Sequence, residues 1–262
     1  MKSKLLTFFV ASALGSIAVL NVSNAWAADS NRFTLATGFD YSSGKYGTAN
    51  NTDILSIPIV GMYQTGSWVL KLTVPYVRIT GVGDVLLGGK RIKAPTTTTT
   101  KSTTQSGLGD VMAAATYNVY SGSENNFGVD VTGRVKFGTA STTLGTGEND
   151  YAAQMGAYKR FGGFTSMMAM GYEVLGSPAG VDLNNVSYGT LIGDYKFTEQ
   201  INGGAEMRVS EKPSAIGAVQ QELTIYLNHR IDNSFNIRGY ALKGFSDGSA
   251  DNSFGLIASL QL

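Results

Sequence analysis

The residues best suited to chemistry are few, beginning with a single histidine, His229, and no cysteine. One imidazole without any thiol cannot form a zinc site, so we expect no metal and no other cofactor. A membrane-embedded lipid hydrolase would need a serine and a polar partner converging on His229. Ser214 and Ser234 are near in sequence but fall in predicted loops. We therefore expect no enzyme and no catalytic residue, and we interpret His229 as an interfacial side chain beside Arg230.

Charged and tyrosine side chains form a second group, because they recur at every other position of otherwise apolar segments. Side chains of a β-strand alternate between two faces, so these residues share one face of each strand. Between positions 127 and 137, for example, Asp130, Arg134 and Lys136 alternate with valine and phenylalanine. We expect this polar face to line the lumen of a barrel, with the members Lys71, Asp130, Arg134, Lys136, Glu206, Arg208, Glu222, Tyr226, Arg230, Arg238 and Tyr240.

Two interpretations of this lumen set remain open. In the first, acid–base ladders fill and stiffen the interior of a closed barrel. In the second, the lumen is a hydrated pore whose basic excess, six basic against three acidic members, would favour anionic solutes. A barrel of about twelve strands lies between filled eight-stranded barrels and open sixteen-stranded porins, so strand number permits a narrow channel without requiring one.

The elements that position these residues are predicted to be strands. Apolar and polar residues alternate with period two in many segments, and most segments have the length that a tilted strand needs to cross a bilayer. Pro58 and Pro75 weaken two of them, since proline cannot donate to the ladder. The expected strands are 32–43, 52–64, 67–80, 108–120, 127–138, 150–161, 164–175, 186–197, 201–211, 219–231, 235–245 and 253–262.

The connections alternate between short and long. Every second one is a tight turn, such as Gly162-Gly163 or Asp232-Asn233-Ser234, and the others are longer and polar. This alternation is typical of an outer-membrane barrel, whereas a β-sandwich does not require connections that alternate in length. We therefore expect an all-β fold: a closed antiparallel transmembrane β-barrel of about twelve strands. The longest connection, 81–107, is either a flexible outer loop, a lid over the mouth, or a basic contact with lipopolysaccharide phosphates.

The first 27 residues predict a cleaved signal peptide. Two lysines within 1–4 precede an apolar run from Leu5 to Leu20, and the segment closes on Ala25-Trp26-Ala27. This is the order of a secretory leader. A membrane anchor is the alternative, but an anchor needs about 20 apolar residues and this run is shorter. We expect 1–27 to be removed and 28–262 to form the barrel.

Location and partners follow from this organisation. We expect the protein in the outer membrane of a Gram-negative bacterium, in contact with outer-membrane lipid, lipopolysaccharide and a small-molecule solute. The last strand, ending at Leu262, resembles the terminal strand that the barrel-assembly machinery binds during biogenesis, although the usual last residue is aromatic. Charge is nearly balanced, with 20 Lys and Arg against 19 Asp and Glu, so no nucleic-acid partner is expected.

Four short stretches resemble a known family, the outer-membrane proteins named for meta-pathway phenol degradation. They are Ser106–Asp110 (SGLGD), Arg134–Thr139 (RVKFGT), Leu144–Tyr151 (LGTGENDY) and Gly239–Gly248 (GYALKGFSDG). The resemblance implies a transporter-like barrel linked to aromatic compounds, and it implies no catalytic residues. Independently of any family, we expect loop glycines in these stretches at positive φ, namely Gly107, Gly109, Gly145 and Gly147.

The leading hypothesis is an outer-membrane channel for passive uptake of small molecules. Aromatic or other small hydrophobic compounds are implied by the resemblance alone. A closed structural or adhesive barrel that acts through its outer loops is the alternative, and a lipid hydrolase is a third.

The turn at 232–234 also predicts the register of the last strands. Counting back from it pairs Ile231 with Phe235, Asn228 with Arg238 and Tyr226 with Tyr240. Across the preceding connection, Arg208 should come near Glu222.

Overall fold

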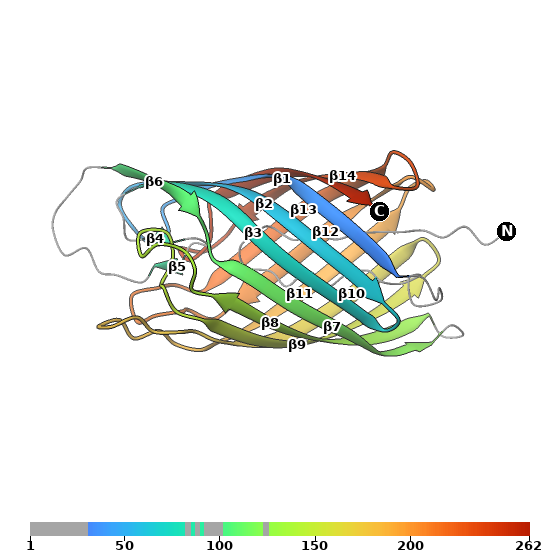
Figure 1. The fold of residues 1–262 in the computed structure, drawn as a ribbon, viewed down its shortest axis with the longest axis horizontal. Coiled ribbons are helices and arrows are strands. Elements are labelled where there is room, and N and C mark those ends of the chain that lie inside the picture. The colour runs from blue at the N-terminus through green and yellow to red at the C-terminus, as the bar shows by residue number, and fades with distance from the viewer. Residues whose placement is uncertain (1–30, 82–84, 87–89, 92–101, 123–125) are drawn as a thin grey trace.

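The computed structural model describes residues 31–81, 85–86, 90–91, 102–122 and 126–262. The predicted leader, 1–27, lies outside these residues and stays a prediction. In the described part of the chain, no helix is long and apolar enough to cross a membrane. Figure 1 shows long tilted strands wrapped around one axis.

The long strands form one closed antiparallel barrel. β1 (Arg32–Gly44) pairs with β2 (Thr52–Thr65) on one side and with the last strand, β15 (Asn252–Gln261), on the other, so the sheet closes on itself. Closure leaves no sheet edge with unpaired backbone N–H and C=O groups, which lipid could not hydrogen-bond. The other strands are β3 (Trp68–Gly81), β4 (Val85–Leu86), β5 (Lys90–Arg91), β6 (Thr103–Leu108), β7 (Val111–Gly122), β8 (Phe127–Phe137), β9 (Asp150–Phe161), β10 (Phe164–Val174), β11 (Val186–Lys196), β12 (Ile201–Ser210), β13 (Gln220–Arg230) and β14 (Phe235–Gly244).

The predicted count of twelve spanning strands is confirmed. β6 and β7 run along the same neighbour, β3, and together make one span, while β4 and β5 pair only with each other. Eleven of the predicted ranges end within one residue of the observed strands. The exception is the predicted strand 108–120, which corresponds to β7 together with β6. Because β6 pairs with the end of β3 nearer the mouth, the span begins at Thr103 and the predicted connection 81–107 is shorter. Much of that connection lies outside the described residues, so its role stays a prediction.

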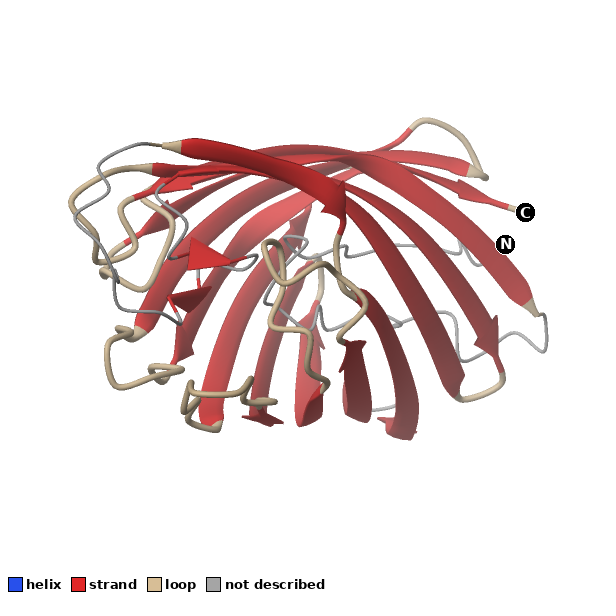
Figure 2. Cartoon of the chain, turned by 60° about the vertical axis from the view of Figure 1, so that its left-hand side comes forward, coloured by secondary structure: helices blue, strands red, loops and turns tan. Residues whose placement is uncertain are grey.

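The connections lie at two ends of the barrel, as Figure 2 shows. The end with tight turns includes Gly66, at φ 50°, and Gly162, at φ 63°. Both glycines adopt the left-handed backbone that such turns require and that residues with a Cβ avoid. The longer connections, including 138–149 and 245–251, lie at the opposite end. We call this second end the mouth.

Alternation along the strands separates an outer face from an inner face as predicted. On the outer face Leu72, Met207 and Ile225 are each at least half exposed. On the inner face Asp130 and Arg208 are 4% exposed. Aromatic pairs flank the outer face, with the exposed Trp68 against Tyr117 near the tight turns and the half-buried Tyr41 against the exposed Phe254 nearer the mouth. An apolar outer band between aromatic girdles is the surface that a bilayer requires. The protein is therefore an outer-membrane β-barrel.

The two prolines interrupt the ladder without ending their strands. Pro58 and Pro75 lie directly opposite each other in β2 and β3. The β1–β2 ladder skips the Pro58 position, and on the far side of β3 the Gly109 N–H donates to the Pro75 carbonyl at 2.8 Å. Since proline lacks an N–H, each removes a ladder bond on one side only.

Candidate functional site

The structure places most residues of the predicted lumen set inside the barrel. Those buried to below 9% exposure are Asp130, Glu206, Arg208, Tyr226, Arg238 and Tyr240, and those partly buried are Lys71, Arg134, Lys136 and Glu222. Arg230 is different, because it lies at the end of β13 beside the tight turns. There its Nη2 donates to the Glu199 carbonyl at 2.6 Å. Arg230 thus belongs to the rim of the barrel and not to its mid-height.

The predicted pairing of the last strands is confirmed. Tyr226 lies opposite Tyr240 and Asn228 opposite Arg238 in the β13–β14 ladder. Arg208 lies directly opposite Glu222 in the β12–β13 ladder. The register could be predicted because the tight turn fixes it, and because a slip by one residue would turn every charged side chain toward lipid.

Tyrosines of the inner wall lie flat on glycines of the adjacent strand. Four such pairs are directly opposite in their ladders: Tyr158 on Gly128, Tyr188 on Gly171, Tyr226 on Gly204 and Tyr240 on Gly255. A Cβ added at Gly171 would lie 2.2 Å from the Tyr188 ring, and one at Gly128 would lie 2.3 Å from the Tyr158 ring. Each glycine therefore makes room for a ring that covers its backbone.

Arginines stack on three of these tyrosines. The Arg238 guanidinium lies 4.1 Å from the centre of the Tyr226 ring, and the Arg208 guanidinium lies 4.5 Å from that of Tyr188. Arg160 repeats the arrangement over Tyr158 at 5.8 Å. A guanidinium over an aromatic face is attracted by the ring quadrupole, so the inner wall holds its arginines in fixed positions.

Carboxylates hold two of the tyrosines from the other side. The Tyr226 hydroxyl donates to Asp194 Oδ2 at 3.0 Å, and the Asn202 amide donates to the same oxygen at 2.7 Å. The Tyr240 hydroxyl makes a short hydrogen bond to Asp40. These bonds fix the two rings, and the bond to Tyr226 also fixes Arg238, which is stacked on that ring.

These aspartates correct the predicted basic excess. Five further buried acids were omitted from the lumen set: Asp40, Asp150, Glu173 and Asp194 lie in strands, and Asp110 lies between β6 and β7. The six-to-three count therefore does not describe the interior. The signal was present in the sequence, because Glu173 and Asp194 alternate with outward residues just as Asp130 does.

Charge is nevertheless unevenly distributed within the interior. Arg134 is paired, with its Nη2 3.1 Å from Glu173 Oε1. Lys71 has different surroundings, because the charges that act on it most strongly are those of Arg134 and Arg238. No carboxylate of the described residues forms an ion pair with Lys71. Lys71 of β3 thus lies in the field of two further cations, Arg134 of β8 and Arg238 of β14, which themselves have acidic neighbours.

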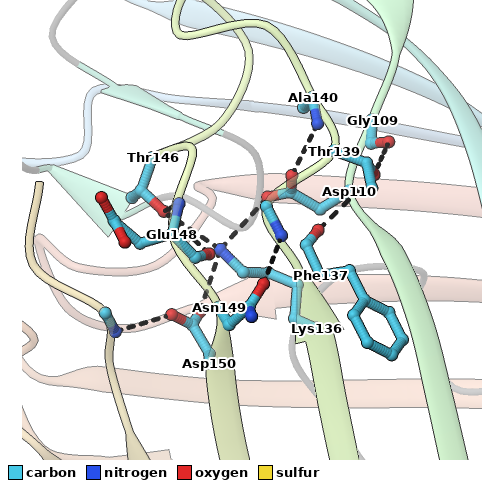
Figure 3. A network of polar contacts seen from close by, with 12 residues as sticks. Gly109, Asp110, Lys136, Phe137, Thr139, Ala140, Thr146, Glu148, Asn149 and Asp150 are labelled. Atoms are coloured by element: carbon cyan, nitrogen blue, oxygen red, sulfur yellow. Dashed lines mark hydrogen bonds and ion pairs between the residues drawn. The ribbon is translucent and has the colours of Figure 1, made fainter.

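At the mouth the opposite arrangement holds. Lys136 Nζ lies 3.1 Å from Asp110 Oδ2 and 3.1 Å from Asp150 Oδ2, and it donates to the Thr146 hydroxyl at 3.2 Å (Figure 3). Asp110 also accepts from the Ala140 N–H at 2.9 Å. Asp150 in turn accepts from the N–H of residue 176 at 3.0 Å. We call this network the mouth lock, because it ties the connection 138–149 to three strands.

The mouth lock joins three of the four stretches that carry the family resemblance: Ser106–Asp110, Arg134–Thr139 and Leu144–Tyr151. The expected positive φ is confirmed for Gly147, at 76°, but is wrong for Gly107, Gly109 and Gly145. Gly107 belongs to β6 and has extended backbone. Gly145 is required by close packing, because a Cβ there would lie 2.8 Å from Asp110 Oδ2.

An apolar cluster lies under the mouth lock. Leu144, 2% exposed, and Tyr46, 4% exposed, come from two different outer connections and pack with inward residues of the strands. Burial raises the pKa of the Tyr46 hydroxyl to about 12, so this side chain stays neutral. We call this set the mouth cluster; its members are Tyr46, Ile54, Val77, Ile79, Ala140, Leu144, Leu242 and Ala250.

His229 lies on the outer face of β13, as expected. Its direct partners in the two ladders are Ile201 and Ile237. Both residues directly opposite the histidine are therefore aliphatic.

The comparisons with known proteins agree with the barrel geometry. No protein-family model matches the sequence, and no curated protein matches it. Among solved structures, the COG4313 outer membrane channel from Pseudomonas putida F1 superposes with a TM-score of 0.69 at 12% identity, covering 88% of this chain and 96% of that one. The chain has the fold of outer-membrane channels.

Two further structures show the same architecture. The NanC porin superposes with a TM-score of 0.58 at 11% identity, covering 87% of this chain and 100% of that one. The KdgM porin superposes with a TM-score of 0.50 at 8% identity, covering 87% and 98%. At such identities the likeness concerns the fold. None of these names carries the phenol-degradation label, so that resemblance stays a prediction.

Proposed function

We propose that the protein is a channel through which small solutes cross the outer membrane passively. The observation that carries this proposal is Lys71, an inward lysine with which no carboxylate of the described residues forms an ion pair. An uncompensated cation costs several kcal/mol in a dry interior, so a barrel built as a solid plug would give each lysine an acidic partner. An inward lysine without such a partner is stable where water or anionic solutes enter.

The solute class suggested by the family resemblance, aromatic or small hydrophobic compounds, fits the remainder of the inner wall. Apolar side chains from both sides of the barrel reach the interior at mid-height, among them Val60, Met167 and Ile257. A lumen with apolar and cationic walls is suited to amphipathic solutes rather than to inorganic ions alone.

The test is conductance in planar lipid bilayers. We expect the wild type to conduct KCl, and the double variant Arg134→Glu/Arg238→Glu to shift the reversal potential toward cations. Lys243→Glu is the matched control, because Lys243 is exposed and its one hydrogen bond among the described residues is to Asn252 at 3.4 Å. Unchanged reversal potentials in the double variant, with conductance intact, would place the pathway elsewhere.

A closed structural barrel is the second candidate, and the mouth cluster favours it. Leu144 and Tyr46 are buried where an open mouth would leave them in water. A wild type that never conducts, while correctly folded by heat-modifiable migration on gels, would select this candidate over the channel.

A further inference from the structure

We propose that the interior of the barrel holds a binding site for small carboxylates with an apolar body, formed by Lys71, Asn228 and Arg238. The inference rests on the proposed channel function, because it names the class of solute that the channel selects. It is carried by the hydrogen-bonding capacity that the described chain leaves unused at Asn228, and by Lys71, which forms no ion pair with the described residues.

Asn228 supplies the unused capacity. Its side chain is 2% exposed and points inward from β13, yet among the described residues neither its amide nitrogen nor its amide oxygen has a hydrogen-bond partner. Leaving a buried donor or acceptor unsatisfied costs about 1–3 kcal/mol, so a buried amide with both atoms free calls for a ligand. Asn228 lies directly opposite Arg238, which places a neutral donor beside a guanidinium.

Lys71 supplies the unbalanced charge. Its strongest charged neighbours are Arg134 and Arg238, and the described residues offer it no ion pair. A carboxylate seated between Lys71 and Arg238 would relieve this repulsion and would accept from the Asn228 amide.

Two acids of the inner wall are already engaged by the protein. Asp194 is occupied by the Tyr226 hydroxyl and the Asn202 amide, and Asp40 by the hydroxyls of Tyr240 and Ser253. Glu206 also acts on Arg238, so a solute carboxylate would share the guanidinium with it. The wall therefore fixes Arg238 through Tyr226 before any solute arrives, which lowers the ordering cost of binding.

The apolar body of the ligand has its own surface. The buried apolar cluster at mid-height contains Tyr226 and Tyr240 themselves, together with Ala36, Val60, Met62 and Ile257 from β1, β2 and β15. A carboxylate held by Arg238 and Asn228 would lie beside these side chains. An aromatic or branched monocarboxylate satisfies both surfaces, whereas acetate satisfies only the cations.

The experiment measures benzoate binding to the folded mature protein by calorimetry, with acetate and benzyl alcohol as partial probes. We expect benzoate to bind most tightly of the three. Lys71→Met and Asn228→Leu should each weaken benzoate about tenfold, because each removes one hydrogen bond to a charged group. Lys71→Arg keeps the charge and should keep binding, and Lys243→Met, on the exposed end of β14, should have no effect.

The outcomes separate this site from the channel. If the wild type conducts KCl but binds benzoate no better than acetate or benzyl alcohol, the site is refuted and the channel stands. If the wild type does not conduct but benzoate binding depends on Lys71 and Asn228, the site stands and the channel fails. Equal affinities across wild type, Lys71→Met and Asn228→Leu would overturn the proposal even if all three conduct.

Discussion

Two lysines on the inner face of the barrel have opposite surroundings. Lys136, at the mouth, lies 3.1 Å from each of two aspartates. Lys71, deeper in the barrel, has Arg134 and Arg238 as its strongest charged neighbours. The same residue type is thus neutralised by the protein at one level and left to solvent or solute at the other. Under the proposed function, Lys136 stabilises the fold and Lys71 acts on the solute.

The surroundings of Lys136 and Lys71 fit different tasks at the mouth and deeper in the barrel. At the mouth the ion pairs hold the connection 138–149 in one conformation and carry Leu144 into the mouth cluster. A closed network suits this task, since each of its members fixes the next. Deeper in the barrel, neutralisation by the protein's own acids would remove the attraction for an anionic solute.

The largest expected effect is a loss of stability when the mouth lock is broken. Lys136→Met leaves two aspartates facing each other with their cation removed, and breaking a buried pair in this way costs about 3 kcal/mol. We expect a lower urea midpoint and faster proteolysis within 138–149. Lys243→Met serves as the control for removing a lysine from an exposed position. A midpoint equal to the wild type would mean that the mouth lock contributes nothing to the fold.

The next effect concerns the inner wall that holds the arginines. Gly171→Ala places a Cβ within 2.2 Å of the Tyr188 ring, which must move and take Arg208 with it. Overpacking of this kind costs about 2 kcal/mol, seen as a lower urea midpoint. Gly133→Ala is the matched control, because nothing lies within 4 Å of its added Cβ. Equal loss in both variants would show that strand propensity, and not the ring, is responsible.

A smaller effect is expected from the loop itself. Gly147 has φ 76° with open space around its Cβ position, so Gly147→Ala tests backbone strain without a serious clash. The strain costs about 1 kcal/mol. We expect a slightly lower urea midpoint and faster cleavage of 138–149, and an unchanged cleavage rate would show that the mouth lock alone holds the loop.

The smallest effect on stability is expected deeper in the barrel. Lys71→Met should leave the free energy of unfolding within about 1 kcal/mol of the wild type, or slightly raise it, because it removes a repelled charge. Anion selectivity in bilayers should nevertheless fall. A large loss of stability in Lys71→Met would give Lys71 the same structural role as Lys136 and would remove the contrast between the two levels.

Much of the fold could be predicted from the sequence because strands and tight turns depend on residues that are close in sequence. Period-two alternation separates inward from outward residues, and tight turns fix the register of the strands that they join. That is why the pairs Asn228–Arg238 and Tyr226–Tyr240 could be predicted from one turn. The extension of the fourth span into β6 could not, because its polar threonines resemble a loop and are ordered only by pairing with β3.

The sequence by itself determined the twelve strands, the two faces and the inward direction of the charged side chains. Only the tertiary structure decided which of those charges meet, since alternation says that Lys71 and Lys136 both point inward and is silent on what lies across the lumen. It also decided that the side chains of Tyr46 and Leu144, two residues of the outer connections, pack against inward residues of the strands. The physical reason is that such contacts join residues far apart in sequence, whose encounter depends on closure of the sheet and on the stagger of its strands.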